Sequence, residues 1–249
     1  MEGASTFVAA ILLAATFIFG GYLEIGAAAH RRRWLSVAAG IAVAYVFVQY
    51  LPELSEAQVA FSKATAGRGL PFPEQRVYAS ALLGFIIFYG LEHLVSRSRR
   101  RRWEERATEG KGNPVYWLHV SGFAIYSGLV SYLMAGEGER GLHFLILYFV
   151  AMFLHFLAAD HSLRSEHGSL YDRSGKWIIA AAVLAGWVLG RASAIPETGI
   201  ITLQGLVGGG VIVNSMVMEL PTEKEGRFWP FCGGAVGYAL MLLLIAGTS

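Results

Sequence analysis

The chain has 249 residues, of which 55% are hydrophobic and only 15% are charged. This composition is typical of an integral membrane protein and excludes an ordinary soluble domain. The net charge of +2 does not indicate nucleic-acid binding, because the basic residues form short clusters between apolar runs. Cys232 is the only cysteine, so no internal disulfide can form.

Apolar stretches of about 20 residues recur along the sequence, and each is long enough to cross a hydrocarbon core about 30 Å thick. We therefore predict an all-α fold, a polytopic membrane helix bundle that forms one domain over residues 1–249. The first stretch begins at Ser5 without a basic leader or a cleavage signature, which favours a retained helix. The eight predicted spans cover residues 5–29, 34–54, 77–96, 114–135, 142–163, 177–194, 200–220 and 228–247.

Two further features predict how these helices connect and pack. The long connection after the second span, LSEAQVAFSKATAGRGLPFPEQR, predicts a short helix and then a proline-marked turn. The seventh and eighth spans contain GLVGGGVIV and CGGAVGYAL, and small residues of this kind let helix backbones approach closely in bilayers. We predict close helix contacts at Gly209 and Gly234.

Lysine and arginine are distributed unevenly between the two sides of the predicted bundle. Fifteen of the 20 follow an odd-numbered span, and only five lie on the other side. Because basic loops stay cytoplasmic, both termini are predicted outside, in a plasma (inner) membrane. The run RSRRRRWEER is predicted to anchor this topology, with a specific site for anionic lipid headgroups as the alternative. Its first five basic residues are Arg97, Arg99, Arg100, Arg101 and Arg102.

Polar side chains at membrane depth are costly, which makes each of them a candidate for function. His119 lies in the second turn of the fourth span, and His155 lies a little over two turns from the end of the fifth. Gln49 and Asn214 also lie inside predicted spans. Glu92 lies close to a helix end, where a snorkelling or capping role is expected.

His119 and His155 stand on spans that a short GEGERG turn makes antiparallel neighbours. Their predicted depths agree within about one helical turn, so we predict that the two imidazoles meet and form a metal site. The alternative is that each histidine only forms a hydrogen bond to a neighbouring helix.

The stretch LHFLAADHSLRSEH ends the fifth span and carries three histidines and two acids. At 100° per residue, Asp160 and His161 point away from His155 on opposite sides, so neither shares its helix face. We expect most of DHSLRSEH to lie at the membrane surface. Asp160 and His161 therefore enter the prediction only as accessory ligands, together with Gln49 and Asn214.

Several segments together resemble the ZIP family of divalent-metal transporters. They are YVFVQYLPELSEA, LLGFIIFYGLEHLVSR, GGGVIVNSMVMELPTE and FCGGAVGYALMLLL, which are similar to its second, third, seventh and eighth helices. The resemblance implies a 3+2+3 arrangement in which the first and last three helices form an inverted pseudo-repeat. Inverted repeats place the substrate near the membrane midplane.

The resemblance also implies a metal site on the fourth and fifth helices, with His119 and His155 matching its leading histidines. This sequence departs from the family pattern at the other ligands. Phe123 and Phe156 replace acidic ligands, and Gln49 stands where the second helix usually has histidine. Phe123 and Phe156 are predicted to fill the space of the metal, so that Zn²⁺ or another divalent cation binds weakly and only through both histidines.

Three functions follow as expectations. The first is a ZIP-like transporter of divalent metal cations with a degenerate site. The second is a non-transporting membrane scaffold or regulatory relative, in keeping with the lost ligands. The third is a zinc-dependent intramembrane hydrolase, but no zinc-protease pattern, phosphate-binding loop or nucleophile elbow supports an enzyme, so we predict none. We expect the lipid bilayer as partner and consider a homodimer.

Overall fold

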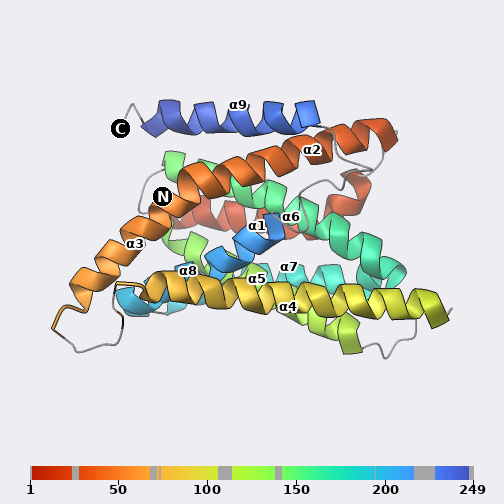
Figure 1. The fold of residues 1–249 in the computed structure, drawn as a ribbon, viewed down its shortest axis with the longest axis horizontal. Coiled ribbons are helices and arrows are strands. Elements are labelled where there is room, and N and C mark those ends of the chain that lie inside the picture. Colours follow the sequence, from red (N-terminus) through yellow and green to blue (C-terminus); the bar gives the residue numbers. More distant parts are fainter. Residues whose placement is uncertain are drawn as a thin grey trace.

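A computed structural model describes residues 2–23, 28–67, 72, 74–105, 114–137, 142–193, 195–215 and 228–246. Within these residues the chain is almost entirely helical and contains no strand, in agreement with the predicted all-α class. The π-helices η1 (Tyr45–Tyr50) and η3 (Tyr171–Gly175) interrupt the α-helices. The α-helices are α1 (Glu2–Leu23), α2 (Ala28–Ala44), α3 (Leu51–Ala64), α4 (Arg76–Glu105), α5 (Pro114–Glu137), α6 (Leu142–Leu170), α7 (Lys176–Ala192), α8 (Glu197–Asn214) and α9 (Phe228–Ala246) (Figure 1).

Five helical segments in the described part of the chain are long and apolar enough to cross a membrane, which is consistent with an integral membrane protein. They are Gly3–Tyr22, Ser36–Ala64, Arg76–Ser98, Pro114–Gly136 and Leu145–Ala192, and Phe228–Leu244 is a shorter apolar helix. Each of the eight predicted spans falls mainly on helical residues. The first span was predicted too long, because Ala28 and Ala29 already belong to α2. Residues 24–27, 194, 216–220 and 247 of the predicted spans lie outside the described residues.

The second predicted span does not end where the sequence suggested. Helices α2, η1 and α3 follow one another without a break, so the short helix predicted after this span directly continues it. Pro52 lies in the first turn of α3 and lacks a backbone N–H, and the π-helical turn directly precedes it. Part of the predicted proline-marked turn, residues 68–71 and 73, lies outside the described residues.

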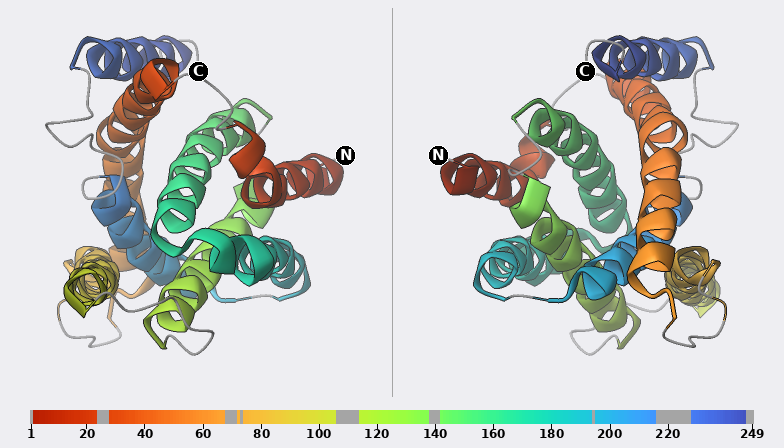
Figure 2. Two further views of the ribbon diagram at one scale, coloured as in Figure 1. Left: turned by 90° about the vertical axis from the view of Figure 1, so that its right-hand side faces the viewer. Right: turned by 90° about the vertical axis from the view of Figure 1, so that its left-hand side faces the viewer.

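The fifth and sixth predicted spans are joined by a sharp turn at Gly168. This residue has φ 51° and ψ −129°, a conformation that is open almost only to glycine. Gly168 lies within α6, which ends at Leu170 and is followed directly by η3 and α7. The chain is therefore helical on both sides of this turn. The loop predicted between the two spans is therefore wound into helix, and His167 near the end of α6 contacts His119 of α5. Figure 2 shows the course of these helices.

The helices lie in two layers (Figure 2). One layer holds α2, α3, α4, α8 and α9, with α4 packed along α8 and α2 along α9. The other holds α1, α5, α6 and α7, with α5 packed along α7 and α1 against both α6 and α7. Aromatic side chains fill much of the interior, among them the fully buried rings of Tyr116, Phe123, Tyr126, Phe156 and Tyr171.

Glycines make the closest of these helix contacts, as predicted for Gly209 and Gly234. A Cβ atom on Gly209 would overlap the carbonyl oxygen of Ala81 in α4, and one on Gly234 would overlap that of Val37 in α2. The small-residue contact predicted from the sequence is therefore confirmed at both positions.

Candidate metal centre

Three potential metal ligands come together where α6 ends against the first turns of α5. They are His119 of α5 and Glu166 and His167 of α6, and one ligand atom of each lies within 4.8 Å of the other two. Both histidines are buried, and the Glu166 side chain is only 10% exposed. The Gly168 turn follows His167 directly, so the tight reversal of the chain holds this end of α6 against α5.

The distances inside this cluster are close to those of a coordination sphere. His119 Nδ1 lies 2.9 Å from His167 Nε2, a hydrogen bond in which one ring nitrogen donates, and 3.5 Å from Glu166 Oε2. Ligands of a tetrahedral Zn²⁺ ion sit about 2.1 Å from the metal and so about 3.4 Å from one another. A cation bound here would replace the proton between the two histidines, and their two nitrogens would move apart by about 0.5 Å to reach the spacing of ligands.

The chemistry of these donors selects a class of cation. Two imidazole nitrogens and one carboxylate oxygen suit Zn²⁺ and other divalent first-row transition metals. Mg²⁺ and Ca²⁺ prefer a shell made of oxygen alone. The cluster therefore fits a transition-metal ion of intermediate softness, such as Zn²⁺.

Glu92 of α4 approaches the opposite nitrogen of the same histidine. Its Oε2 atom lies 3.8 Å from His119 Nε2, and its side chain is 16% exposed. His119 Nε2 is fully buried and has no hydrogen-bond partner among the described residues. A carboxylate that faces the outer nitrogen of a metal-binding histidine fixes the ring and raises its basicity. The sequence predicted only a snorkelling or capping role for Glu92. The structure places its carboxylate beside His119 and so adds Glu92 to the residues around the candidate metal centre.

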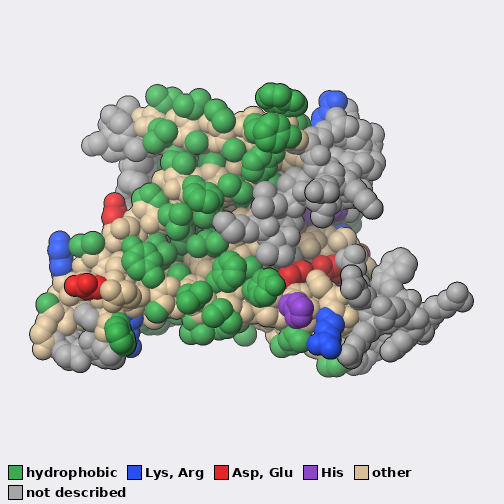
Figure 3. Space-filling model, in the orientation of Figure 1, with side chains coloured by type: hydrophobic (Ala, Val, Ile, Leu, Met, Phe, Trp, Pro, Cys, Tyr) green, Lys and Arg blue, Asp and Glu red, His purple; other side chains and the backbone are tan. Residues whose placement is uncertain are grey.

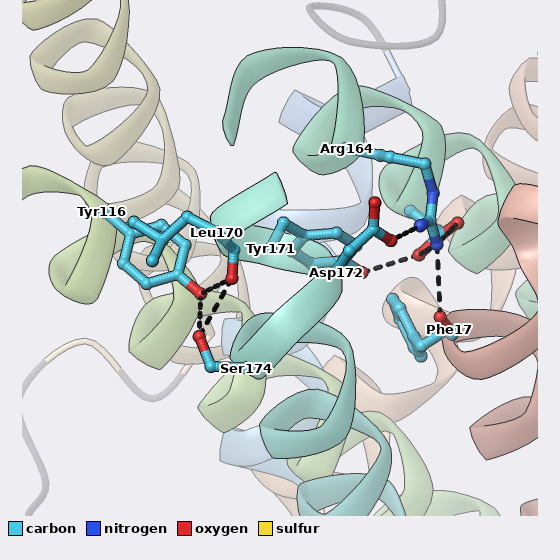
Figure 4. A network of polar contacts seen from close by, with 8 residues as sticks. Phe17, Tyr116, Arg164, Leu170, Tyr171, Asp172 and Ser174 are labelled. Atoms are coloured by element: carbon cyan, nitrogen blue, oxygen red, sulfur yellow. Dashed lines mark hydrogen bonds and ion pairs between the residues drawn. The ribbon is translucent and has the colours of Figure 1, made fainter. Parts of the chain in front are cut away.

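Aromatic rings enclose the cluster on two sides. Phe123 packs edge-on against His119 with ring centroids 5.2 Å apart, and Tyr116 packs against His167 at 5.1 Å. The Tyr116 hydroxyl donates to the carbonyl oxygen of Leu170 at 3.1 Å and lies 2.6 Å from Ser174 Oγ (Figure 4). These bonds tie the start of α5 to the segment beyond Gly168, which keeps His119 and His167 in register.

The structure gives the two predicted ligands, His119 and His155, different partners. His119 contacts His167, whereas His155 Nε2 lies 2.9 Å from the hydroxyl of Tyr126. Tyr126 is seven residues beyond His119 on α5, about 10 Å along the helix axis at 1.5 Å per residue. Phe123 packs between these levels, against both His119 and Tyr126. His155 thus belongs to a buried aromatic cluster.

Phe156 belongs to the same cluster. It is fully buried, beside His155 and against Phe17 of α1. Both phenylalanines that were predicted to fill the space of the metal are packed in the interior, Phe123 beside His119 and Phe156 beside His155.

Asp160 is buried and already paired with a cation of the chain itself. Arg164 Nη2 donates to both carboxylate oxygens, at 3.1 and 3.0 Å, and Tyr171 donates to Oδ1 at 2.7 Å (Figure 4). Arg164 also contacts Asp172 and the carbonyl oxygen of Phe17. The guanidinium group occupies the place that a metal would take beside Asp160.

The other predicted accessory residues are not members of the cluster of His119, Glu166 and His167. Gln49 donates to Glu53 at 2.7 Å within the second predicted span, and Asn214 is buried in α8. His161 is partly exposed on α6. Arg97 is exposed on α4, where Arg99, Arg100, Arg101 and Arg102 continue the helix with side chains outside the described set.

The sequence did not identify Glu166 and His167 as ligands. We expected both at or beyond the membrane surface and did not predict that His167 is buried within the bundle, where it is only 3% exposed. The signal that was available is the glycine that follows them in SEHGSL, since a glycine between two helical patterns can mark a sharp reversal.

Comparison with known proteins adds no family assignment. No protein-family model matches the chain, and the search of curated proteins gives no match. The resemblance to ZIP transporters therefore stays a prediction from short motifs.

Proposed function

We propose that this chain is a ZIP-like integral membrane protein that transports a divalent transition-metal cation, and that His119, Glu166 and His167 bind this cation. The observation that carries the proposal is the cluster of two buried imidazoles and one carboxylate at coordination-like distances. Ionisable side chains inside an apolar bundle are costly, so three that converge at one place indicate a site for a ligand.

The helix pairing supports the finer architecture of this proposal, eight spans in a 3+2+3 arrangement. An inverted repeat would relate α1 to α7, the α2–α3 helix to α8, α4 to α9, and α5 to α6. The pair α4·α8 then corresponds to α9·α2, and α5·α7 corresponds to α6·α1. These four pairs are among the main contacts of the bundle, and α1 also packs on α7, its own counterpart.

The proposed roles follow from the position of each donor. His119 holds the cation through Nδ1, while Glu92 accepts a hydrogen bond from Nε2 once the two side chains close from 3.8 Å. Glu166 supplies negative charge that offsets part of the cation's charge in an apolar surrounding. The cation is treated as cargo, so the site must bind it reversibly.

A non-transporting relative is the second candidate, and a specific observation favours it. The interior beyond the cluster is filled by Phe123, Tyr126, His155 and Phe156, and Arg164 already neutralises Asp160. Large, tightly packed side chains of this kind obstruct the passage of a cation beyond the cluster. In such a protein the metal would stabilise the bundle without crossing it.

Zinc binding and zinc flux separate these candidates. We expect the purified protein to bind Zn²⁺ in calorimetry, and His119→Ala or His167→Ala to weaken binding by at least about 10- to 100-fold, the range found when groups that support a metal are lost. His155→Ala is the matched control, because this histidine is equally buried on α6 but bonded to Tyr126. Thermal melting of each variant shows whether it folds.

Proteoliposomes with a zinc-sensitive dye then measure transport. Flux that is lost in His119→Ala and kept in His155→Ala supports the transporter. Tight binding without flux assigns the chain to the second candidate. If binding survives the double change of His119 and His167 to alanine, or depends on His155 alone, the proposed site is wrong.

A further inference from the structure

A groove runs along the outer surface of the bundle between α4 and α5. Its volume is about 590 Å³, within the range of ligand-binding clefts. It is open along one side, and its lining is almost entirely apolar. Ile86, Gly90 and Leu94 of α4 and Leu118, Gly122 and Ile125 of α5 form most of its walls.

Glycine creates the hollow. A Cβ atom on Gly90 would meet no atom within 4 Å, so the groove is empty above this residue. Helix α4 packs tightly against α8 instead, where a Cβ on Gly84 would overlap the carbonyl oxygen of Leu206. The side of α4 that faces away from α8 therefore stays uncovered, and hydrophobic side chains cover the face of the molecule on which α4 lies (Figure 3).

One end of the groove carries the positive charge of Arg97. His93 lines the groove, and Arg97 follows one turn later on the same face of α4. Both side chains are exposed, and the arginine-rich run continues the helix from there. Eleven residues separate Ile86 from Arg97, a distance of about 16 Å along the helix. This is close to half of a hydrocarbon core about 30 Å thick, the depth of one leaflet.

We propose that the α4–α5 groove binds one anionic phospholipid, with an acyl chain along Ile86, Gly90 and Leu94 and the phosphate beside His93 and Arg97. The apolar length and the cationic end match the two parts of such a lipid. The proposal requires only that the bundle lies in a bilayer, and it stands apart from the metal centre.

Native mass spectrometry of the purified protein with phosphatidylglycerol or phosphatidylcholine tests the proposal. We expect one phosphatidylglycerol to stay bound per chain and to fall to background in Gly90→Leu, because a Cβ atom at this position meets no atom within 4 Å and the leucine side chain occupies the groove. Gly237→Leu is the matched control, because a Cβ on this α9 glycine also meets nothing within 4 Å. Arg97→Gln should lower the preference for phosphatidylglycerol about fivefold, the effect of one basic side chain.

Arg173→Gln controls for any exposed arginine, because Arg173 lies outside the groove. Equal retention of the two lipids by the natural protein overturns the proposal, and so does unchanged retention in Gly90→Leu. A dimer that disappears in Gly90→Leu also overturns it, because the groove is then covered by a second copy of the chain.

Discussion

His119 is the residue on which the candidate centre depends, because its two ring nitrogens face different acidic side chains. Nδ1 faces Glu166 and His167, and Nε2 faces Glu92. The ring therefore links a position for a cation to a carboxylate on a third helix. This arrangement resembles the carboxylate–histidine–metal relay that orients ligands in many metal sites.

Glu92→Gln tests this relay by replacing one carboxylate oxygen with an amide nitrogen. The amide keeps the shape but loses the negative charge, so the His119 ring becomes less basic, and we expect zinc affinity to fall by about 10-fold or more. Isothermal titration calorimetry measures the change. Glu53→Gln is the control, since Glu53 bonds Gln49 away from the cluster. Equal affinity in both variants would remove Glu92 from the centre.

Arg164→Met tests the second buried charge cluster. Asp160 is only 1% exposed, and the change leaves its carboxylate without the guanidinium group. Breaking a buried ion pair from one side costs about 3–5 kcal/mol, so the free energy of unfolding should fall by that order. Denaturation in detergent measures it. The double variant Asp160→Asn with Arg164→Met should recover part of the loss, and a further loss instead would contradict the pairing.

At the scale of the helices, Gly168 determines where the polar end of α6 lies. Gly168→Ala places a side chain at φ 51°, ψ −129°, and we expect a loss of about 1–3 kcal/mol in unfolding free energy. Zinc affinity should fall as well, because His167 is the preceding residue. Gly237→Ala, a change at an open helical glycine, should leave both quantities nearly unchanged. Equal melting of the two variants would show that the turn tolerates a side chain.

Hydrophobic patterning predicted the helices well, because a helix that crosses a bilayer needs a long apolar stretch. A single polar residue within such a stretch does not obscure the pattern. It predicted the ends of helices poorly. The π-helix at Tyr45–Tyr50 and the reversal at Gly168 depend on local backbone geometry, which apolar periodicity does not record. Glu166 and His167 were missed for this reason, since their burial follows from the reversal. His119 was found because it interrupts an apolar span.

At the scale of the whole molecule, the unequal distribution of basic residues predicts the orientation in the membrane. Reporter fusions at Arg101 and at the C-terminus should report opposite sides, with Arg101 inside, because the arginine-rich run stays cytoplasmic. A fusion after Glu137, between the fourth and fifth predicted spans, serves as the outside control. The same side for Arg101 and the C-terminus would mean an even number of spans between them, in place of the five that the sequence predicts.

The π-helix in the second span makes this helix sensitive to deletions. A π-helical turn contains one residue more than an α-helical turn, and here the N–H of Leu51 bonds to the carbonyl oxygen of Val46. Deleting one residue from Tyr45–Tyr50 would restore α-helical pairing and rotate α3 by about 100° relative to α2. Tyr50 would then turn away from the Gln204 carbonyl oxygen, to which its hydroxyl now donates at 2.5 Å. The additional residue of the π-helical turn thus determines how far α3 is rotated about the helix axis relative to α2.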